Sequence, residues 1–364
     1  MRVLLLGGTG AMGVSLKDIL AERGDEVYIT SRSQHKDYGM IHYLQGDAHE
    51  DNFMVDLLKK KYDTIVDFMF YSSSEFSKKA ERLLAATGQY IFVSSSRVYA
   101  DSRTPITEDS PRLLDICKDI DYLNSDEYAL AKAREENILF ESKRKNWTII
   151  RPYITYNVDR LQLGVFEKDI WLYRALHGRS IPLPKDIATH QTTMTYGGDV
   201  AKAIAALIGN KRANGEVFHL TGVEHMLWAD VLKIYCKVLR EKTGRQPLVY
   251  APDDSAELSK IMSNREQVIY DRLYDRVFDN TKLLSTIGTD FEFKTMKSGL
   301  SICLSEFMKS PKWIGGVNFR LEAYLNRQYN EKMENKEFTN ISDKVKYFGW
   351  YHAPGIMTAL KSMK

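Results

Sequence analysis

The stretch "GGTGAMG", residues 7–13, follows directly on the apolar run "RVLLL" of residues 2–6. Glycines at positions 7, 10 and 13 have a physical use where a dinucleotide binds. The first permits a tight turn, the second lets the backbone approach a pyrophosphate, and the third allows a helix to lie close to its strand. The pyrophosphate then lies at a helix N-terminus, where N–H groups and the helix dipole favour negative charge. The same pattern also occurs as a tight turn in other α/β proteins, so its surroundings decide.

Those surroundings alternate between strand and helix. Short β-branched or aromatic runs indicate strands at Arg2–Leu6, Glu26–Thr30, Ile41–Leu44, Thr64–Phe68, Tyr90–Ser94 and Trp147–Arg151. Helical patterns lie between them, at Met12–Arg23, Asp51–Lys61, Glu75–Ala86 and Ser125–Lys145. Such alternation predicts an α/β fold with a doubly wound parallel sheet covered by helices on both faces. Ligands bind beyond the carboxyl ends of such strands, and the glycine-rich stretch follows the end of the first one.

Composition narrows the class of protein. The chain has 364 residues, 44% of them hydrophobic, which is enough for one large core or two unequal ones. No segment approaches the roughly 18 unbroken apolar residues of a membrane helix, and "VLLL" is too short for a signal sequence, so we expect a cytoplasmic protein with no membrane partner. The cysteines, Cys117, Cys236 and Cys303, show no zinc-like spacing, which predicts reduced thiols and no metal site. A net charge of +3 is too small to indicate a nucleic-acid partner.

The second half is less regular. We expect a helix at Asp199–Ile208, a strand at Val217–Leu220 and a helix at Trp228–Glu241. The last sixty residues are charged and rich in tyrosine, as in "RQYNEKMENKEF", and predict a solvated helix with an ordered tail.

Two further patterns carry chemistry. The motif "YALAK" places Tyr128 and Lys132 four residues apart, on one face of a helix. An ammonium beside a phenol favours the phenolate, so such a pair can give and take a proton near neutral pH. Upstream, "FVSSSRVYA" ends a strand with the hydroxyls of residues 94–96. A serine there can bond a substrate oxygen. Each pattern alone also fits a chance pair on an amphipathic helix, or a turn and helix cap.

In combination and order, the glycine turn, the hydroxyl-rich strand end and the YxxxK helix resemble the extended short-chain dehydrogenase/reductases. The closest resemblance is to the NAD(P)-dependent sugar-nucleotide epimerase/dehydratase family, and it extends from residue 1 to about residue 308. Its later motifs match "SSSRVYA" (94–100), "RPYITYN" (151–157), "DVA" (199–201) and "DNTKLLSTIG" (279–288). The resemblance implies a Rossmann-like domain of residues 1–156 and about 186–220. It also implies a smaller substrate-binding region of about 157–185 and 221–308, followed by a C-terminal extension, 309–364.

The resemblance also implies roles for residues. Tyr128 moves a proton on or off a sugar hydroxyl while a hydride passes between the sugar carbon and the nicotinamide. Ser95 matches the catalytic hydroxyl, and Lys132 also holds the nicotinamide ribose. The implied cofactor-binding residues are Gly7, Thr9, Gly10, Ala11, Met12, Gly13, Ser31, Arg32, Asp47, Ala48, Phe68, Met69, Lys132 and Pro152. The implied substrate residues are Tyr71, Ser96, Arg97 and Tyr153.

The end of the second strand distinguishes NADP from NAD. A carboxylate at this position would bond the adenosine ribose and favour NAD. This chain has Thr30, Ser31 and Arg32 instead, and a hydroxyl with a guanidinium suits a 2′-phosphate. We therefore expect NADP to be favoured over NAD, unless Arg32 simply points to solvent. Asp47 matches the family aspartate that contacts the adenine amino group.

The chain departs from the family pattern at the sugar. The 4,6-dehydratases carry an Asp-Glu pair directly after the catalytic hydroxyl, where this chain has Ser96 and Arg97, so dehydration is not expected. Arg97 either contacts an anionic group of the substrate or forms an ion pair with a nearby carboxylate.

The residues expected to recognise the diphosphate of the substrate also differ from the family pattern. Ile154 replaces the asparagine of the 4-epimerases, and "HQTT" (190–193) stands in a region where an arginine is expected. Met69 and Phe70 replace small residues after the fourth strand. The substrate is therefore either a nucleotide sugar bound in a different way or a related sugar.

We expect an NAD(P)-dependent sugar-nucleotide epimerase acting at one carbon, C4, and assembling as a homodimer. The alternative is an NADPH-dependent reductase of a 4-keto nucleotide sugar, which Arg32 favours. A third interpretation, a non-catalytic NADP-sensing or RNA-binding protein, is weakened because Ser95, Tyr128 and Lys132 are all present.

Overall fold

The computed structural model describes residues 1–10, 12–262 and 264–362, so Ala11 lies outside the described residues. The chain divides into two compact units. The first contains Met1–Asn157, Gln191–Met226 and Tyr274–Leu300, and the second contains Val158–His190, Leu227–Leu273 and Ser301–Lys364. Residues 221–226 and 274–300, expected in the substrate-binding region, lie in the first unit, and residues 186–190, expected in the Rossmann-like domain, lie in the second.

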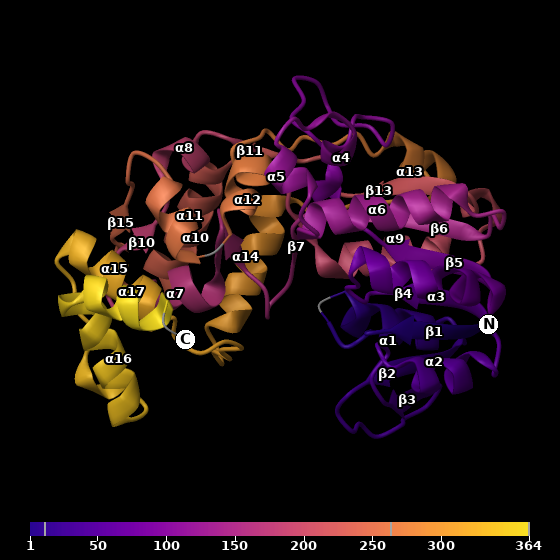
Figure 1. Cartoon of the computed structure of the whole chain (residues 1–364), viewed down its shortest axis with the longest axis horizontal. Helices are drawn as coiled ribbons and strands as arrows, with labels where there is room; N and C mark the ends of the chain where they lie inside the picture. Colours follow the sequence, from indigo (N-terminus) through magenta and orange to yellow (C-terminus); the bar gives the residue numbers. More distant parts are fainter. Residues whose placement is uncertain (11, 263, 363–364) are drawn as a thin grey trace. The chain divides into compact units, whose positions relative to one another are not determined.

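The first unit is built on a seven-stranded sheet with the order β13-β6-β5-β4-β1-β2-β3, drawn as arrows in Figure 1. All neighbouring strands are parallel. The strands are β1 (Arg2–Leu6), β2 (Glu26–Ser31), β3 (Ile41–Gln45), β4 (Tyr62–Asp67), β5 (Thr87–Val93), β6 (Trp147–Pro152) and β13 (Glu216–Leu220). The structure confirms the doubly wound α/β fold, with the chain reversing direction across the sheet at β1.

Strand β1 shows why these runs are apolar throughout. Val3 and Leu5 lie in one buried cluster, with side chains of α1 and α9. Leu4 and Leu6 lie in another, with side chains of α2, α3 and α6. Because successive side chains point to opposite faces and helices cover both faces, the four positions from Val3 to Leu6 are all buried. The helices are α1 (Gly13–Glu22), α2 (Asp51–Leu58), α3 (Ser73–Ala85), α6 (Tyr128–Glu141) and α9 (Gly197–Leu207).

Helix α6 is shorter than the helix predicted at 125–145, and that prediction is wrong at both ends. Before the helix, the Glu127 side chain accepts a hydrogen bond from Ala129 N (2.8 Å) and so caps the first turn. After it, Ser142 is extended, with ψ of 139°, and the chain turns toward β6. The cap fixes where the helix begins and the turn fixes where it ends, although the polar residues on either side would also be compatible with a longer helix.

Shorter elements complete the first unit. They are η1 (Ser96–Val98), α4 (Leu113–Ile116), α5 (Ile120–Leu123), β7 (Thr155–Tyr156), β11 (Gln191–Thr192), β12 (Thr195–Tyr196), η2 (Lys211–Ala213) and α13 (Thr281–Ile287). Along the chain, β14 (Met226–Leu227) and α14 (Met296–Phe307) pass from the first unit to the second.

The second unit is mainly helical. Its elements are β8 (Gln162–Leu163), β9 (Phe166–Glu167), α7 (Lys168–Leu176), β10 (Ile181–Pro182), α8 (Lys185–Ala188), α10 (Trp228–Thr243), β15 (Val249–Tyr250), α11 (Ala256–Met262), α12 (Arg265–Gln267), η3 (Val268–Arg272), α15 (Phe319–Tyr329), η4 (Asn335–Glu337), α16 (Ile341–His352) and α17 (Pro354–Ser362). No helix within the described ranges is long and apolar enough to cross a membrane.

The C-terminal segment is not the solvated helix that was predicted. Leu321 and Leu325 of α15 are fully buried, and so is Tyr347 of α16. The error arises because the charged residues of α15 conceal an apolar stripe at i, i+4 spacing. Some of the charges are themselves buried: Glu322 is only 3% exposed.

Candidate active site

The glycine turn has the geometry that a dinucleotide requires. Gly7 has φ of 67°, a conformation that favours glycine, and its N–H donates to Thr30 Oγ1 (2.9 Å). A Cβ on Gly13 would lie 2.2 Å from the Gly8 carbonyl oxygen, so only glycine lets α1 begin this close to the turn. A Cβ on Gly10 would meet no described atom within 4 Å, which leaves the backbone open to a ligand. These residues fit a pyrophosphate at the start of α1, which Met12 precedes.

The residues expected around the adenosine lie at the ends of β2 and β3. Ser31 is the last residue of β2, and its Oγ lies 3.1 Å from His35 Nε2. Arg32 follows it and is exposed. Asp47 Oδ1 accepts a hydrogen bond from His49 N (2.9 Å), and Ala48 is buried.

The backbone just after β4 accepts a hydrogen bond from the Lys132 ammonium. Met69 N donates to Asp67 Oδ1 (2.9 Å), and the Met69 carbonyl accepts a hydrogen bond from Lys132 Nζ (3.2 Å). The ammonium also donates to Glu135 Oε2 (2.9 Å) and lies 4.5 Å from the centre of the Phe92 ring. Lys132 is only 2% exposed, and these two oxygen atoms and the aromatic ring surround its ammonium in place of water.

Tyr128 begins α6, one turn before Lys132, and its ring is partly exposed. It stacks on Phe70, with ring centres 5.5 Å apart, and the Arg97 guanidinium lies 5.2 Å from its centre. Arg97 also forms an ion pair with Glu127 (2.7 Å). The arginine therefore has the ion pair that was one of its two expected roles.

The three serines after β5 make different contacts. Ser94 Oγ donates to Glu136 (2.6 Å), and Ser96 Oγ donates to the Arg151 carbonyl (2.8 Å). Ser95 Oγ accepts a hydrogen bond from Arg97 N (3.2 Å) and donates none to the residues that the structure describes. Of the three hydroxyls, Ser95 is the one that structural contacts engage least.

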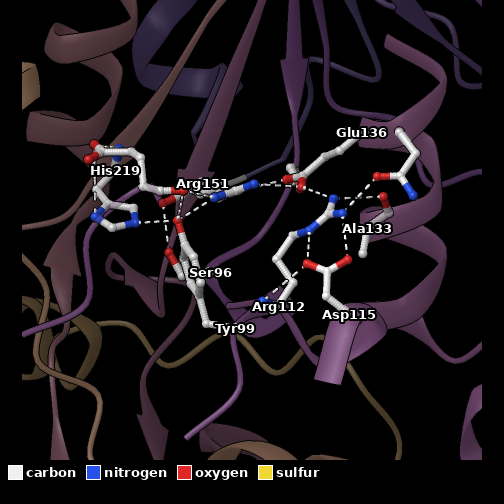
Figure 2. Close-up of polar contacts among 11 residues, drawn as sticks. Ser96, Tyr99, Arg112, Asp115, Ala133, Glu136, Arg151 and His219 are labelled. Atoms are coloured by element: carbon white, nitrogen blue, oxygen red, sulfur yellow. Dashed lines mark hydrogen bonds and ion pairs between the residues drawn. The ribbon is translucent and has the colours of Figure 1, made fainter. Parts of the chain in front are cut away.

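A buried ion-pair network holds the ends of β5 and β6 against α6 (Figure 2). The sequence motifs did not predict this network. Arg151 donates from two nitrogens to the two Glu136 oxygens, both at 2.7 Å, and Arg112 donates to the same carboxylate (3.1 Å). Tyr99 completes it by bonding both Arg151 and His219 Nε2 (2.7 Å for the latter). Burial would raise the pKa of Glu136, but Arg151, Ser94 and Arg112 together lower it below its usual value. The sequence contained one indication that Glu136 lies near the site: it follows Lys132 by four residues, on the same helix face.

Family comparison agrees with this geometry. The model of the NAD dependent epimerase/dehydratase family matches residues 3–220, more than half of the chain. The chain belongs to this family. It is 26% identical over 253 residues to the chloroplast stem-loop binding protein of 41 kDa b of Arabidopsis thaliana. That match covers 65% of this chain and 62% of the length of that relative.

Solved structures of similar fold carry related names. One is the dTDP-glucose 4,6-dehydratase of Bacillus anthracis in complex with NAD (17% identity, TM-score 0.64, covering 86% of this chain and 98% of that one). Another is the UDP-glucuronic acid 4-epimerase of Bacillus cereus in complex with NAD (15% identity, TM-score 0.61, covering 85% and 99%). At such identities they show the shared fold.

The remaining expected residues of this epimerase/dehydratase family member differ in exposure, from the exposed Thr9 to two buried tyrosines. Tyr71 is fully buried, and its hydroxyl donates to Asp67 Oδ2 (3.1 Å). Tyr153 is 3% exposed and packs on Phe278. Phe68, Thr9 and Pro152 follow or end strands at the carboxyl edge of the sheet. Among the described residues, no group of three or more histidine, cysteine, aspartate or glutamate side chains is placed to hold a metal ion.

Proposed function

We propose that the protein is an NAD(P)-dependent sugar-nucleotide epimerase that acts at one sugar carbon, C4, with Tyr128 as acid and base. One observation carries the proposal: Tyr128 and Lys132 lie one turn apart on α6, and Lys132 reaches the carbonyl at the end of β4. This is the edge of the sheet at which the glycine turn fits a dinucleotide.

In this proposal each group of the chain has a task. The backbone of Gly7 to Gly13 and the start of α1 bind the pyrophosphate, and Lys132 holds the nicotinamide ribose. A bound nicotinamide cofactor supplies hydride acceptance and donation at the sugar carbon. Ser95 bonds the sugar oxygen and orients it toward Tyr128. The Tyr128 oxygen would take the proton from that hydroxyl and later return it to the carbonyl oxygen of the keto sugar. The configuration would invert because the keto sugar turns over between the two steps, so that the hydride returns to the opposite face of the carbon.

We also propose that NADP binds more tightly than NAD. Support comes from Ser31 and the exposed Arg32 at the end of β2, where the chain offers a hydroxyl and a guanidinium. If the cofactor exchanges in each cycle, the same residues serve a 4-keto sugar reductase, which is the alternative within this class of enzyme.

A substrate panel tests the proposal. Purified protein is incubated with NAD or NADP and with UDP-glucose, UDP-glucuronic acid or a 4-keto nucleotide sugar, and products are separated from their epimers by chromatography. Epimerisation without net change in cofactor absorbance supports the epimerase. Consumption of one NADPH for each keto sugar supports the reductase, and no conversion of any sugar contradicts both.

A second candidate function is the binding of RNA stem-loops. It is favoured by the likeness to the chloroplast stem-loop binding protein, although the net charge of +3 is small. Fluorescence anisotropy with a labelled RNA hairpin, and with an unpaired strand of the same composition as control, decides it. Saturable binding of the hairpin alone, persisting at moderate salt, favours this function. Weak binding of both strands that salt abolishes contradicts it.

A further inference from the structure

Glu135 places a buried negative charge beside Lys132. Its carboxylate is 0% exposed, and Oε2 accepts from Lys132 Nζ at 2.9 Å. The other oxygen, Oε1, has no hydrogen-bond partner among the described residues. Buried polar atoms are nearly always bonded, so a carboxylate left half satisfied calls for a reason other than stability.

Its neighbour in the sequence shows the contrast. Glu136 is equally buried, but Ser94, Arg112 and Arg151 satisfy both of its oxygens. Glu136 therefore explains how the strand ends are held together. Glu135 adds nothing to that network, and its single described partner is the lysine of the YxxxK pair.

The groups that act on Glu135 come from several elements. Burial raises the pKa of its carboxyl to about 7, Lys132 opposes the rise, and the negative charges of Asp67 and Asp126 add to it. The Glu135 charge in turn contributes to the raised pKa of the Tyr71 and Tyr90 hydroxyls. Other charges on elements packed against α6 are paired elsewhere: Glu75 with Lys79 on α3, Arg97 with Glu127, and Arg112 with Asp115 and Glu136.

Lys132 lies beside Glu135 and on the same helix as Tyr128. The lysine follows the tyrosine by one helical turn, and both lie against Phe70, the ammonium 6.0 Å from its ring centre. A cation near a phenol favours the phenolate, whereas a carboxylate 2.9 Å from that cation offsets the effect. We propose that Glu135 is a positioning residue that sets, through Lys132, how readily Tyr128 releases its proton. The functional meaning of this coupling rests on the role proposed for Tyr128.

The coupling has a definite sign. With a proton on Glu135, the pair with Lys132 carries one positive charge. Once Glu135 has released that proton to solvent, the pair is neutral. In the pH range where phenols ionise, Glu135 is already negative, since its pKa of about 7 lies below that range. Replacing it by a neutral side chain therefore leaves the lysine charge uncompensated and makes Tyr128 ionise at lower pH.

A substrate-free titration tests this. The ionisation of Tyr128 is followed as the difference in near-ultraviolet tyrosinate absorbance between a protein and its Tyr128→Phe counterpart as pH is raised. We expect Glu135→Gln to lower the midpoint by about half a pH unit or more. The matched control is Glu108→Gln. Glu108 is another carboxylate with a pKa raised by burial, it accepts from His219 N (2.9 Å), and its replacement should leave the midpoint in place.

A midpoint that is unchanged or higher in Glu135→Gln overturns the proposal, as does an equal shift in Glu108→Gln. If Glu135→Gln does not fold, Glu135→Asp replaces it, because the shorter side chain withdraws the charge from Lys132 and should lower the midpoint by a smaller amount. The titration needs no sugar and no cofactor. A lowered midpoint in a protein that converts no sugar therefore contradicts the proposed function and leaves the charge coupling standing.

Discussion

Each unit of the molecule contains a buried ion-pair network, and the two networks have opposite characters. In the first unit, Arg151 pairs with Glu136, which lies 15 residues away in sequence. In the second, Arg174 pairs with Glu322 (2.8 Å), which lies 148 residues away. The first network holds the strand ends and helix that carry the proposed catalytic groups. The second joins α7 to the C-terminal segment.

The pKa values of Glu136 and Glu322, the carboxylates at the centre of the two networks, are shifted in opposite directions. Several donors keep the pKa of Glu136 below its usual value, whereas burial raises the pKa of Glu322, despite Arg174 and Arg179. A lowered carboxyl pKa contributes stability that is lost as pH falls, and a raised one contributes stability that is lost as pH rises. The donors around Glu136 therefore outweigh the effect of its burial, whereas those around Glu322 do not.

Deleting residues 319–364 should have the largest effect. It removes Glu322, Glu331 and Glu337, which are the carboxylate partners of Arg174 and Arg179, together with the buried Leu321, Leu325 and Tyr347. Losing the burial of an apolar side chain costs about 1.5–3 kcal/mol, so the loss of several approaches the whole stability of a domain. We expect limited proteolysis to degrade the second unit. Deleting only 354–364, which contains α17 and none of these carboxylates, is the control and should leave a resistant protein.

Glu136→Gln should destabilise the first unit by about 3–5 kcal/mol, because it leaves Arg151 and Arg112 without their buried carboxylate. Chemical denaturation followed by circular dichroism measures the change. Glu141→Gln on the same helix, where the side chain is exposed, should change stability by less than about 0.5 kcal/mol. Equal stabilities of the two variants would contradict the network's importance.

Acid should weaken the first unit through His219. Burial lowers the pKa of this imidazole to about 4, and its ring bonds Tyr99 and the Asp279 carbonyl. Since the folded pKa lies below the usual value, the stability it contributes is complete above about pH 6.5 and is lost as pH falls toward about 4. That loss is about 3 kcal/mol. In His219→Gln the unfolding free energy should fall less on acidification. An identical fall in parent and variant would assign the acid sensitivity to other groups.

The smallest effect lies outside both networks. Arg32→Ala should weaken NADP binding by about 1.5–3 kcal/mol and leave NAD binding unchanged, because only NADP has a 2′-phosphate for the guanidinium. Isothermal titration with each cofactor measures the preference. Lys36→Ala, which removes another exposed cation nearby, is the control. Equal affinities of the parent for NADP and NAD would refute the preference at the outset.

Much of the first unit could be predicted from sequence because its signals are local. The run of residues 2–6 and the glycines after it specify a strand, a turn and a helix within about twenty residues. The same holds for Tyr128 and Lys132, whose spacing alone puts them on one helix face.

The networks could not be predicted in the same way. Nothing near Arg174 in the sequence indicates that Glu322 or Glu331 will lie beside it, and charged residues are ordinarily exposed. The position of Glu135 was also hidden. Its burial depends on how α6 packs against β4 and β5, which no local pattern encodes.

The most direct test of the central claim is the turnover of Tyr128→Phe on whichever nucleotide sugar the parent converts. This change removes one hydroxyl and leaves both ion-pair networks in place, so unfolding and cofactor affinity should stay close to those of the parent. Tyr122→Phe, which alters a nearby hydroxyl bonded to Glu127 (3.1 Å), is the control and should keep most activity. We predict that Tyr128→Phe lowers kcat by about two to four orders of magnitude. A folded Tyr128→Phe protein with the kcat of the parent would contradict the account.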